Sequence, residues 1–100
     1  MTSASIVPDL LRERAAEDPG SVALRVGADE VLTLGAWEER SNAVARGLVA
    51  RGVRPGDRVA LAFGERRWAD HAVGYLGVLK AGAVAVPVGS RFAGPELDRI

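Results

Sequence analysis

Residues 57–88, DRVALAFGERRWADHAVGYLGVLKAGAVAVPV, decide the fold of this 100-residue chain. Within them, residues 57–63 and 83–88 are short apolar runs with the length and composition of buried strands. Residues 66–81, between the two runs, have the length of a helix. A strand, a helix and a second strand in this order predict a βαβ unit with two parallel strands, and therefore an α/β fold.

Two flanking helices and a hairpin are expected before this unit. Residues 6–17 and 34–51 show apolar side chains at helical spacing, with charged side chains between them. Pro8 suits the first turn of the first helix, and Thr33 suits the N-cap of the second. Residues 22–33 contain two short apolar runs joined by a four-residue link with a glycine, which predicts a short antiparallel hairpin.

The helical spacing also predicts which side chains are buried. The expected apolar face of the first helix consists of Ile6, Leu10, Leu11 and Ala15. The expected buried stripe of the second helix consists of Trp37, Val44, Ala45, Leu48 and Val49. The side chains of that helix expected to face water are Glu38, Glu39, Arg40, Asn42 and Arg46. Both patterns are typical of helices with one buried face.

Glycines mark the expected ends and turns of these elements. Gly52 suits the left-handed position after the helix 34–51. In the run Arg54-Pro55-Gly56-Asp57, proline and glycine occupy the second and third positions of a type II turn, where glycine supplies the positive φ. The strand 57–63 carries apolar residues on both faces, which predicts layers of structure above and below it.

The helix 66–81 is apolar nearly all round, as is usual for a helix buried within a larger protein. Gly74 and Gly77 remove side chains from one face, at about 1 kcal/mol each relative to alanine, so a neighbouring backbone can come close. Residues 94–97 (Gly-Pro-Glu-Leu) predict the start of a further helix, within which the chain stops. We therefore expect residues 1–100 to be an incomplete N-terminal subdomain.

Composition argues against several classes of function. The 13 basic and 13 acidic residues balance, which gives no electrostatic argument for nucleic acid or an anionic membrane. One histidine and no cysteine leave little for disulfide or transition-metal chemistry. The most apolar run, residues 74–88, is shorter than the roughly 20 residues of a membrane span. Since residues 1–5 show no secretory signal pattern, we expect a cytoplasmic protein.

Few residues are placed to carry chemistry. His71 is the only histidine, and adjacent Asp70 does not face it on a helix, so a structural role is favoured over a general base. Nothing in the spacing pairs Asp70 with Glu65 or Glu96, and solvated surface charge is favoured over catalytic carboxylates. The dinucleotide-binding and Walker A glycine patterns do not occur in the sequence.

Ser90 and Arg91 follow the carboxyl end of the second strand, the edge at which ligands of open α/β sheets bind. A solvated turn is the favoured interpretation of this pair. Residues 65–67 (Glu-Arg-Arg) lie at the same edge and are interpreted as a helix start. A core position is favoured over an apolar pocket for three aromatic side chains, Trp68, Tyr75 and Phe92. We therefore assign no catalytic, cofactor-binding or metal-binding residue.

Four runs of the sequence carry a family resemblance. Residues 52–61 read GVRPGDRVAL, residues 72–83 read AVGYLGVLKAGA, and residues 84–88 read VAVPV. Before them, Leu32-Thr33 is followed by Trp37-x-x-x-Ser41-Asn42-x-x-Ala45. In this order and spacing, the four runs resemble the N-terminal region of the adenylate-forming (AMP-binding) enzymes. That family includes acyl- and aryl-CoA synthetases, luciferases and nonribosomal peptide adenylation domains.

Within this family, residues 86–92 (VPVGSRF) look more like an acyl-CoA synthetase. Peptide adenylation domains usually have an Asp-Pro-x-Tyr-Pro type of run there. The resemblance implies a parent ligase that adenylates a carboxylic acid with ATP and Mg²⁺ and passes the acyl group to CoA, as in fatty acid metabolism. It also implies that residues 1–100 are scaffold that binds no cofactor, because the family's phosphate loop and catalytic lysine lie beyond residue 100.

Two alternatives remain open at this point. The parent could be an adenylation domain that loads a carrier-protein thiol. The chain could also be a small non-catalytic α/β interaction module, which would bury the apolar helix 66–81 against a partner. The expected partners are the remainder of the chain itself and a small-molecule carboxylic acid, with a second copy of the chain as a further alternative and no nucleic acid.

Overall fold

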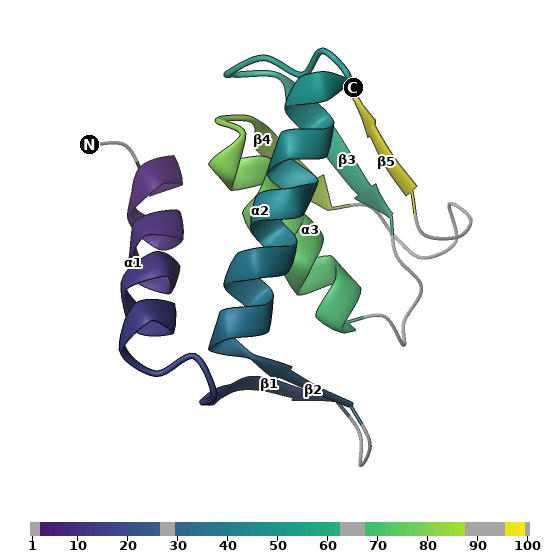
Figure 1. Cartoon of the computed structure of the whole chain (residues 1–100). Coiled ribbons are helices and arrows are strands. Elements are labelled where there is room, and N and C mark those ends of the chain that lie inside the picture. Colours follow the sequence, from purple (N-terminus) through teal and green to yellow (C-terminus); the bar gives the residue numbers. More distant parts are fainter. Residues whose placement is uncertain (1–2, 27–29, 63–67, 88–95, 100) are drawn as a thin grey trace.

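The computed structural model describes residues 3–26, 30–62, 68–87 and 96–99. Their helices and strands follow the order α1 (Ser3–Glu17), β1 (Val22–Val26), β2 (Glu30–Thr33), α2 (Leu34–Ala50), β3 (Arg58–Ala62), α3 (Trp68–Lys80), β4 (Val84–Pro87) and β5 (Glu96–Arg99). β1 and β2 form a two-stranded sheet, and a second sheet has the order β4-β3-β5. In Figure 1, α2 and α3 lie side by side, with α1 to one side of them.

The predicted βαβ unit is present. β3 and β4 pair in parallel, with Val59 opposite Ala85 and Leu61 opposite Pro87, and α3 connects them. The predicted hairpin is also confirmed, because β1 and β2 are antiparallel with Val26 opposite Glu30. The α/β class expected from the sequence is therefore right. Residues 63, 66, 67 and 88, at the predicted ends of these elements, lie outside the described residues.

The first helix begins earlier than predicted. α1 starts at Ser3 rather than at residue 6, so Pro8 lies in its second turn and not in its first. Proline there cannot donate to the carbonyl four residues earlier, and its ring crowds that carbonyl, so it weakens the turn that precedes it. The helix ends at Glu17, before the run Asp18-Pro19-Gly20, as predicted.

The caps of α2 are those that the sequence predicts. The Thr33 hydroxyl accepts a hydrogen bond from the Ala36 N–H at 3.1 Å. At the other end, Gly52 has a φ of 94°, and the Val53 N–H donates to the Leu48 carbonyl at 3.0 Å. A left-handed glycine followed by this back-bond is the Schellman arrangement, which satisfies carbonyls at the end of a helix.

α3 ends in the same way, and its end positions the sheet. Gly82 has a φ of 79°, and the Ala83 N–H donates to the Val78 carbonyl at 3.1 Å. The Gly82 carbonyl in turn accepts a hydrogen bond from the Gly56 N–H at 2.9 Å. A Cβ on Gly82 would lie 3.4 Å from the Pro55 Cβ, so the turn before β3 packs directly on the end of α3. This contact helps to align β3 with β4.

The predicted turn at residues 54–57 is confirmed. Gly56 has a φ of 88°, and the Asp57 N–H donates to the Arg54 carbonyl at 3.0 Å. The Asp57 carboxylate also accepts a hydrogen bond from the Arg54 N–H at 2.9 Å. The carbonyl of Asp57 then accepts the Val84 N–H at 2.7 Å, so the turn leads straight into the parallel pairing.

The main core lies where α2, α3 and the sheet meet. Its buried members are Leu48, Val53, Val59, Leu61, Val78 and Ala83. Two pairs in this set, Leu48 with Val53 and Val78 with Ala83, are the residues joined by the back-bonds at the two helix ends. Burial of a valine or leucine side chain stabilises a fold by roughly 1.5–3 kcal/mol. The helix ends therefore contribute both hydrogen bonds and apolar packing to one cluster.

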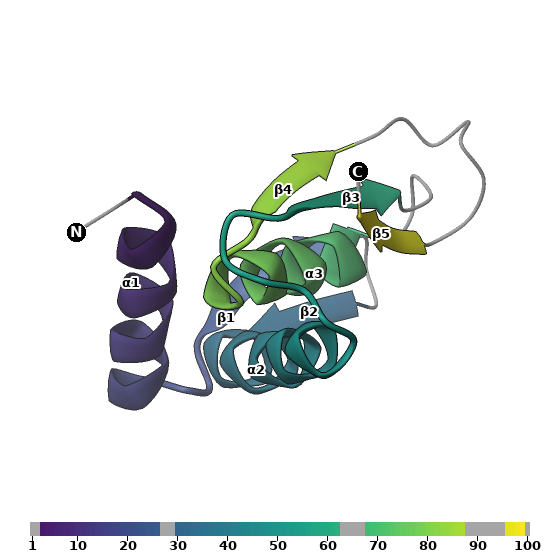
Figure 2. The same ribbon diagram turned by 90° about the horizontal axis from the view of Figure 1, so that it is seen from above.

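Layers on both faces of the sheet are the sequence expectation, and the described residues supply the layer on one face, so the second layer stays a prediction. Figure 2 shows α2 and α3 on one side of the strands β4, β3 and β5, with α1 beside the other two helices. Val59 and Leu61 point to that side and are buried, whereas Val84 on the other side is exposed. The face of the sheet that carries Val59 and Leu61 is covered by α3. The face that carries Val84 is left exposed by the described residues.

The predicted helix at residues 94–97 is also wrong in its described part. Glu96 and Leu97 belong to β5, which pairs antiparallel with β3 and places Leu97 opposite Leu61. Without β5, β3 would present unpaired N–H and C=O groups along one edge. Pairing with β3 satisfies backbone N–H and C=O groups of both strands in this segment.

The buried stripe of α2 is right at Leu48 and wrong at Val49, whose side chain is 58% exposed. Val44 and Leu48, one turn apart, face the core. Val49 lies about 100° round the helix from Leu48 and so falls on the flank of this stripe.

α2 and α3 pack closely where α3 has glycine. A Cβ placed on Gly77 would lie 2.4 Å from Val44 Cγ1 and 3.2 Å from the Ser41 carbonyl oxygen. Ser41 is fully buried, and its hydroxyl donates to the Glu38 carbonyl at 3.1 Å. The close backbone approach predicted for the glycines of this helix is therefore confirmed at Gly77.

The substitution Gly77→Ala tests this contact. Its methyl group has no room beside Val44, so we expect a loss of about 1–3 kcal/mol in the free energy of opening α2 and α3, despite the better helix propensity of alanine. The matched control is Gly47→Ala, because nothing lies within 4 Å of a Cβ at Gly47 in α2. The control should be neutral or stabilise by up to about 1 kcal/mol. Hydrogen exchange of both helices in urea measures the change, and equal effects of the two substitutions would contradict the packing argument.

Candidate functional site

At the carboxyl ends of β3 and β4, the sequence favours a helix start for residues 65–67 and a solvated turn for Ser90 and Arg91. Ser90, Arg91 and Phe92 after β4, and residues 65–67 after β3, lie outside the described residues. Glu96 is in β5, where it pairs in register with Ala62. The interpretation of these residues as a solvated turn and a helix start therefore stays a prediction.

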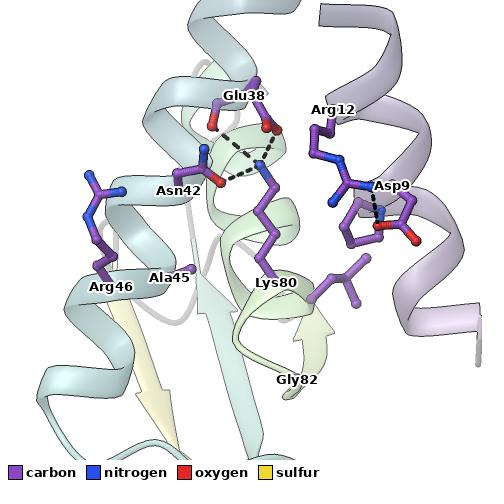
Figure 3. Close-up of a pocket in the computed structure, with 10 residues that line it drawn as sticks. Asp9, Arg12, Glu38, Asn42, Ala45, Arg46, Lys80 and Gly82 are labelled. Carbon is purple, nitrogen blue, oxygen red and sulfur yellow. Dashed lines mark hydrogen bonds and ion pairs between the residues drawn. The ribbon is translucent and has the colours of Figure 1, made fainter. Parts of the chain in front are cut away.

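The described polar cluster with the most contacts surrounds Lys80, at the end of α3. The Lys80 side chain is only 11% exposed, and its ammonium group donates to the Glu38 carboxylate. It also donates to the Asn42 side-chain oxygen at 2.8 Å and to the Glu38 carbonyl at 3.3 Å. Figure 3 shows both α2 residues turned toward the amine across the space between the helices.

This arrangement gives three acceptors to the three N–H donors of a lysine ammonium group. A charge that is nearly buried requires such compensation, because its loss of hydration is otherwise costly. The amine is therefore held as a charged donor that ties α3 to α2, and it is not presented as a free nucleophile. Its evident role is to fix the two helices relative to each other.

The sequence prediction for two of these residues is wrong. Glu38 and Asn42 were expected to face water, and both are partly buried against Lys80. One signal for the contact was available, since Glu38 and Asn42 are four residues apart and share a helix face. Lys80 in an otherwise apolar helix was the second signal. No local sequence pattern indicated that Lys80 contacts Glu38 and Asn42.

An open cleft of about 540 Å³ lies beside this cluster, between α1, α2 and the end of α3. Its lining residues include Pro8, Asp9, Arg12, Glu38, Asn42 and Lys80. Arg12 forms an ion pair with Asp9 at 3.3 Å within α1, and both side chains are partly exposed. Figure 3 shows this pair on the opposite wall from Lys80. The cleft therefore has a charge pair on each wall, Asp9 with Arg12 on α1 and Glu38 with Lys80 between α2 and α3, and Arg46 of α2 also lines it.

These residues do not make a metal site. Across residues 3–26, 30–62, 68–87 and 96–99, no group of three or more His, Cys, Asp or Glu side chains could hold a metal ion. The carboxylates nearest the cleft each face a cation, Asp9 facing Arg12 and Glu38 facing Lys80. The described residues therefore provide no set of ligands for the Mg²⁺ that the family resemblance implies. Within the same ranges, no helix is long and apolar enough to cross a membrane.

His71 lies in the first turn of α3, at the other end of the helix from Lys80. The rings of His71 and Trp68 meet edge-on, with centroids 6.2 Å apart and planes at 72°. Trp68 is 60% exposed and Tyr75 is also exposed, so their predicted core positions are wrong in the described residues. Asp70 pairs with Arg40 of α2 at 3.1 Å, which agrees with surface charge rather than catalysis.

Known proteins are similar to this chain in sequence and in fold. The sequence profile of the AMP-binding enzyme family matches residues 11–100. The nonribosomal peptide synthetase NPS2 of Ceriporiopsis subvermispora is 46% identical over 59 residues, which are 59% of this chain and 2% of that synthetase. A medium/long-chain-fatty-acid–CoA/3-oxocholest-4-en-26-oate–CoA ligase of Mycobacterium marinum is 36% identical over 97 residues, which are 97% of this chain and 17% of that ligase.

A solved structure agrees with these relatives. The fatty acyl-adenylate ligase from L. pneumophila, in complex with acyl adenylate and pyrophosphate, superimposes with a TM-score of 0.71 and 33% identity. The match covers 82% of this chain and 15% of that ligase, and the chain spans less than a fifth of the length of each of the three relatives. Since the profile match covers nine tenths of the sequence and the fold agrees, the chain belongs to the AMP-binding, adenylate-forming enzyme family.

Proposed function

We propose that this chain is part of an ATP-dependent acyl- or aryl-CoA synthetase. The enzyme would join a carboxylic acid to AMP, releasing pyrophosphate, and then transfer the acyl group to the thiol of CoA, releasing AMP. The observation that carries the proposal is the similarity to a CoA ligase over nearly the whole chain. Residues 86–92 (VPVGSRF) support the same choice within the family.

The two steps have a clear chemical reason. A carboxylate is a poor electrophile because its negative charge resists a nucleophile. Joining it to AMP removes that charge and supplies a leaving group when the thiol attacks the carbonyl carbon. Such steps need preorganised donors or cations where charge develops. Arg12, Arg40 and Lys80 are paired with carboxylates, and the family resemblance implies a phosphate loop and a catalytic lysine beyond residue 100, so we place the catalytic groups elsewhere in the polypeptide.

We propose further that residues 1–100 are an incomplete N-terminal subdomain and serve as scaffold. Two observations support this: the chain is much shorter than its relatives, and one face of the sheet β4-β3-β5 is uncovered in the described residues. Val84 is exposed on that face, and Trp68 is exposed on α3. Further polypeptide of the same protein would cover these surfaces. The scaffold would then hold the βαβ unit in place within the complete sheet.

The small molecules of the reaction belong to the complete enzyme in this proposal. ATP, CoA and the carboxylic acid would be its substrates, in fatty acid or aryl acid metabolism. Mg²⁺ would accompany ATP, but no described residue is assigned to it, because the carboxylates beside the cleft are already paired. We also propose a cytoplasmic location for this ATP- and CoA-dependent reaction.

A second candidate is an adenylation domain that passes the acyl group to a carrier-protein thiol. The 46% identity to a nonribosomal peptide synthetase favours it. The first step would be the same in both enzymes, and only the acceptor thiol would differ. A non-catalytic interaction module is the third candidate, for which the exposed apolar side chains of α3 and β4 are the supporting observation.

Pyrophosphate exchange tests the proposed activity. The complete polypeptide, supplied with ATP, Mg²⁺ and a panel of aliphatic and aromatic carboxylic acids, should incorporate labelled pyrophosphate into ATP with at least one acid and not without acid. Addition of CoA should then give an acyl-CoA thioester. Exchange followed by transfer only to a phosphopantetheinyl carrier protein would favour the second candidate. A lack of exchange with every acid would count against both enzymes and favour the interaction module.

The scaffold proposal makes a separate prediction about residues 1–100 alone. Because apolar surface on the sheet and on α3 would be left uncovered, this fragment should bind a hydrophobic dye and should aggregate or melt over a broad range. The complete polypeptide is the control and should bind little dye. Dye fluorescence and scanning calorimetry measure the difference. A monomeric fragment with a sharp melting transition and no dye binding would contradict the proposal.

A further inference from the structure

α1 is attached to the rest of the molecule less firmly than the other helices. Only two of its described side chains, Leu11 and Ala15, are buried. Three further apolar side chains are exposed, Ile6, Val7 and Leu10, the last by 54%. α1 therefore buries part of the apolar face that the sequence gives it. Figures 1 and 2 show it standing apart from the α2–α3 pair.

Hollows lie on both sides of this contact. The cleft of about 540 Å³ beside Lys80 has α1 as one wall. An apolar groove of about 210 Å³ is lined by Val7, Leu10, Leu11, Arg14, Leu34, Trp37 and Leu76, and so lies between α1 and the other two helices. Side chains that line a hollow lack packing partners on that side. The close contact of α1 with α2 and α3 is therefore limited to a narrow strip around Leu11 and Ala15.

Polar contacts also join α2 to α3 more firmly than they join α1 to either helix. α2 and α3 are joined through Lys80 with Glu38 and through Arg40 with Asp70, and the Trp37 indole N–H donates to the Ala72 carbonyl at 2.9 Å. In α1, the ion pair of Arg12 stays within the helix. Among the side chains of residues 6–17, the part of α1 whose side chains the structure describes, none is hydrogen-bonded or ion-paired to α2 or α3.

The C-terminal end of α1 is, in contrast, firmly held. The Pro19 carbonyl accepts a hydrogen bond from the Gly35 N–H at 2.9 Å, and the Ser21 carbonyl accepts one from the Leu34 N–H at 2.9 Å. A Cβ on Gly35 would lie 2.9 Å from the Pro19 Cβ, so the two backbones touch. The segment just after α1 is thus fixed to the start of α2.

We propose that α1 is a hinged arm. It opens as a unit about the fixed contact of Pro19 with Gly35, while α2, α3 and the sheet remain folded. Opening is opposed mainly by the burial of Leu11 and Ala15, and it uncovers the groove side of Trp37 and Leu76. A molecule that contacts α1 and α2 together across the cleft would hold the arm closed, because it would bind the closed state better. The fold thereby contains a switchable cover over an apolar surface.

Hydrogen exchange of the complete polypeptide tests the arm without any assay of activity. In the unmodified protein, amides of residues 6–17 should exchange at least about tenfold faster than the slowest amides of α2 and α3, as expected for a unit that opens locally. Leu11→Ala should accelerate exchange in α1 by about thirtyfold or more and leave α2 and α3 unchanged. Leu10→Ala is the matched control on the same helix and should change exchange by no more than about twofold, because Leu10 is exposed.

Two results would overturn the proposal. The first is exchange in α1 as slow as in α2 and α3 in the unmodified protein, which decides the matter even where Leu11→Ala fails to fold. The second is an equal acceleration of all three helices by Leu11→Ala, since α1 would then open only in global unfolding.

Discussion

α2 and α3 approach each other closely because residue 77 has no side chain, and the rest of the structure depends on this contact. Val44 occupies the space where a Cβ of Gly77 would lie, and the Ser41 carbonyl is close behind it. The approach brings the end of α3 within reach of α2, so that Lys80 can bond Glu38 and Asn42. A wider spacing would leave a nearly buried ammonium group without its acceptors, which is costly.

The two helix ends carry this geometry into the sheet. Each helix stops at a glycine with positive φ, and each places an apolar pair in the same core. The end of α3 then supports the turn before β3 through the hydrogen bond between Gly56 and Gly82. The parallel pairing of β3 and β4 thus follows from how α3 ends. In the proposed enzyme, this chain would supply such a rigid frame and leave the chemistry to other parts of the polypeptide.

The sequence predicted well what is decided locally. The Thr33 cap and the turn at residues 54–57 each follow from residues within a few positions of one another, and each element of the βαβ unit follows from its own apolar run. It predicted poorly what depends on distant partners. β5 is a strand because β3 offers an unpaired edge, and Glu38 is partly buried because Lys80, 42 residues later, reaches it. The exposure of Trp68 depends likewise on what covers α3, which no local pattern reveals.

The most direct test of the central contact is the coupling between Val44 and Gly77, measured by a double-mutant cycle on the opening free energy of α2 and α3. If the Val44 side chain is what excludes a methyl group at residue 77, Val44→Ala should reduce the loss of stability that Gly77→Ala causes. The double variant would then be more stable than the sum of the single effects, by about 1–2 kcal/mol. Additive effects, within about 0.5 kcal/mol, would contradict the account, because the two residues would then not compete for the same space.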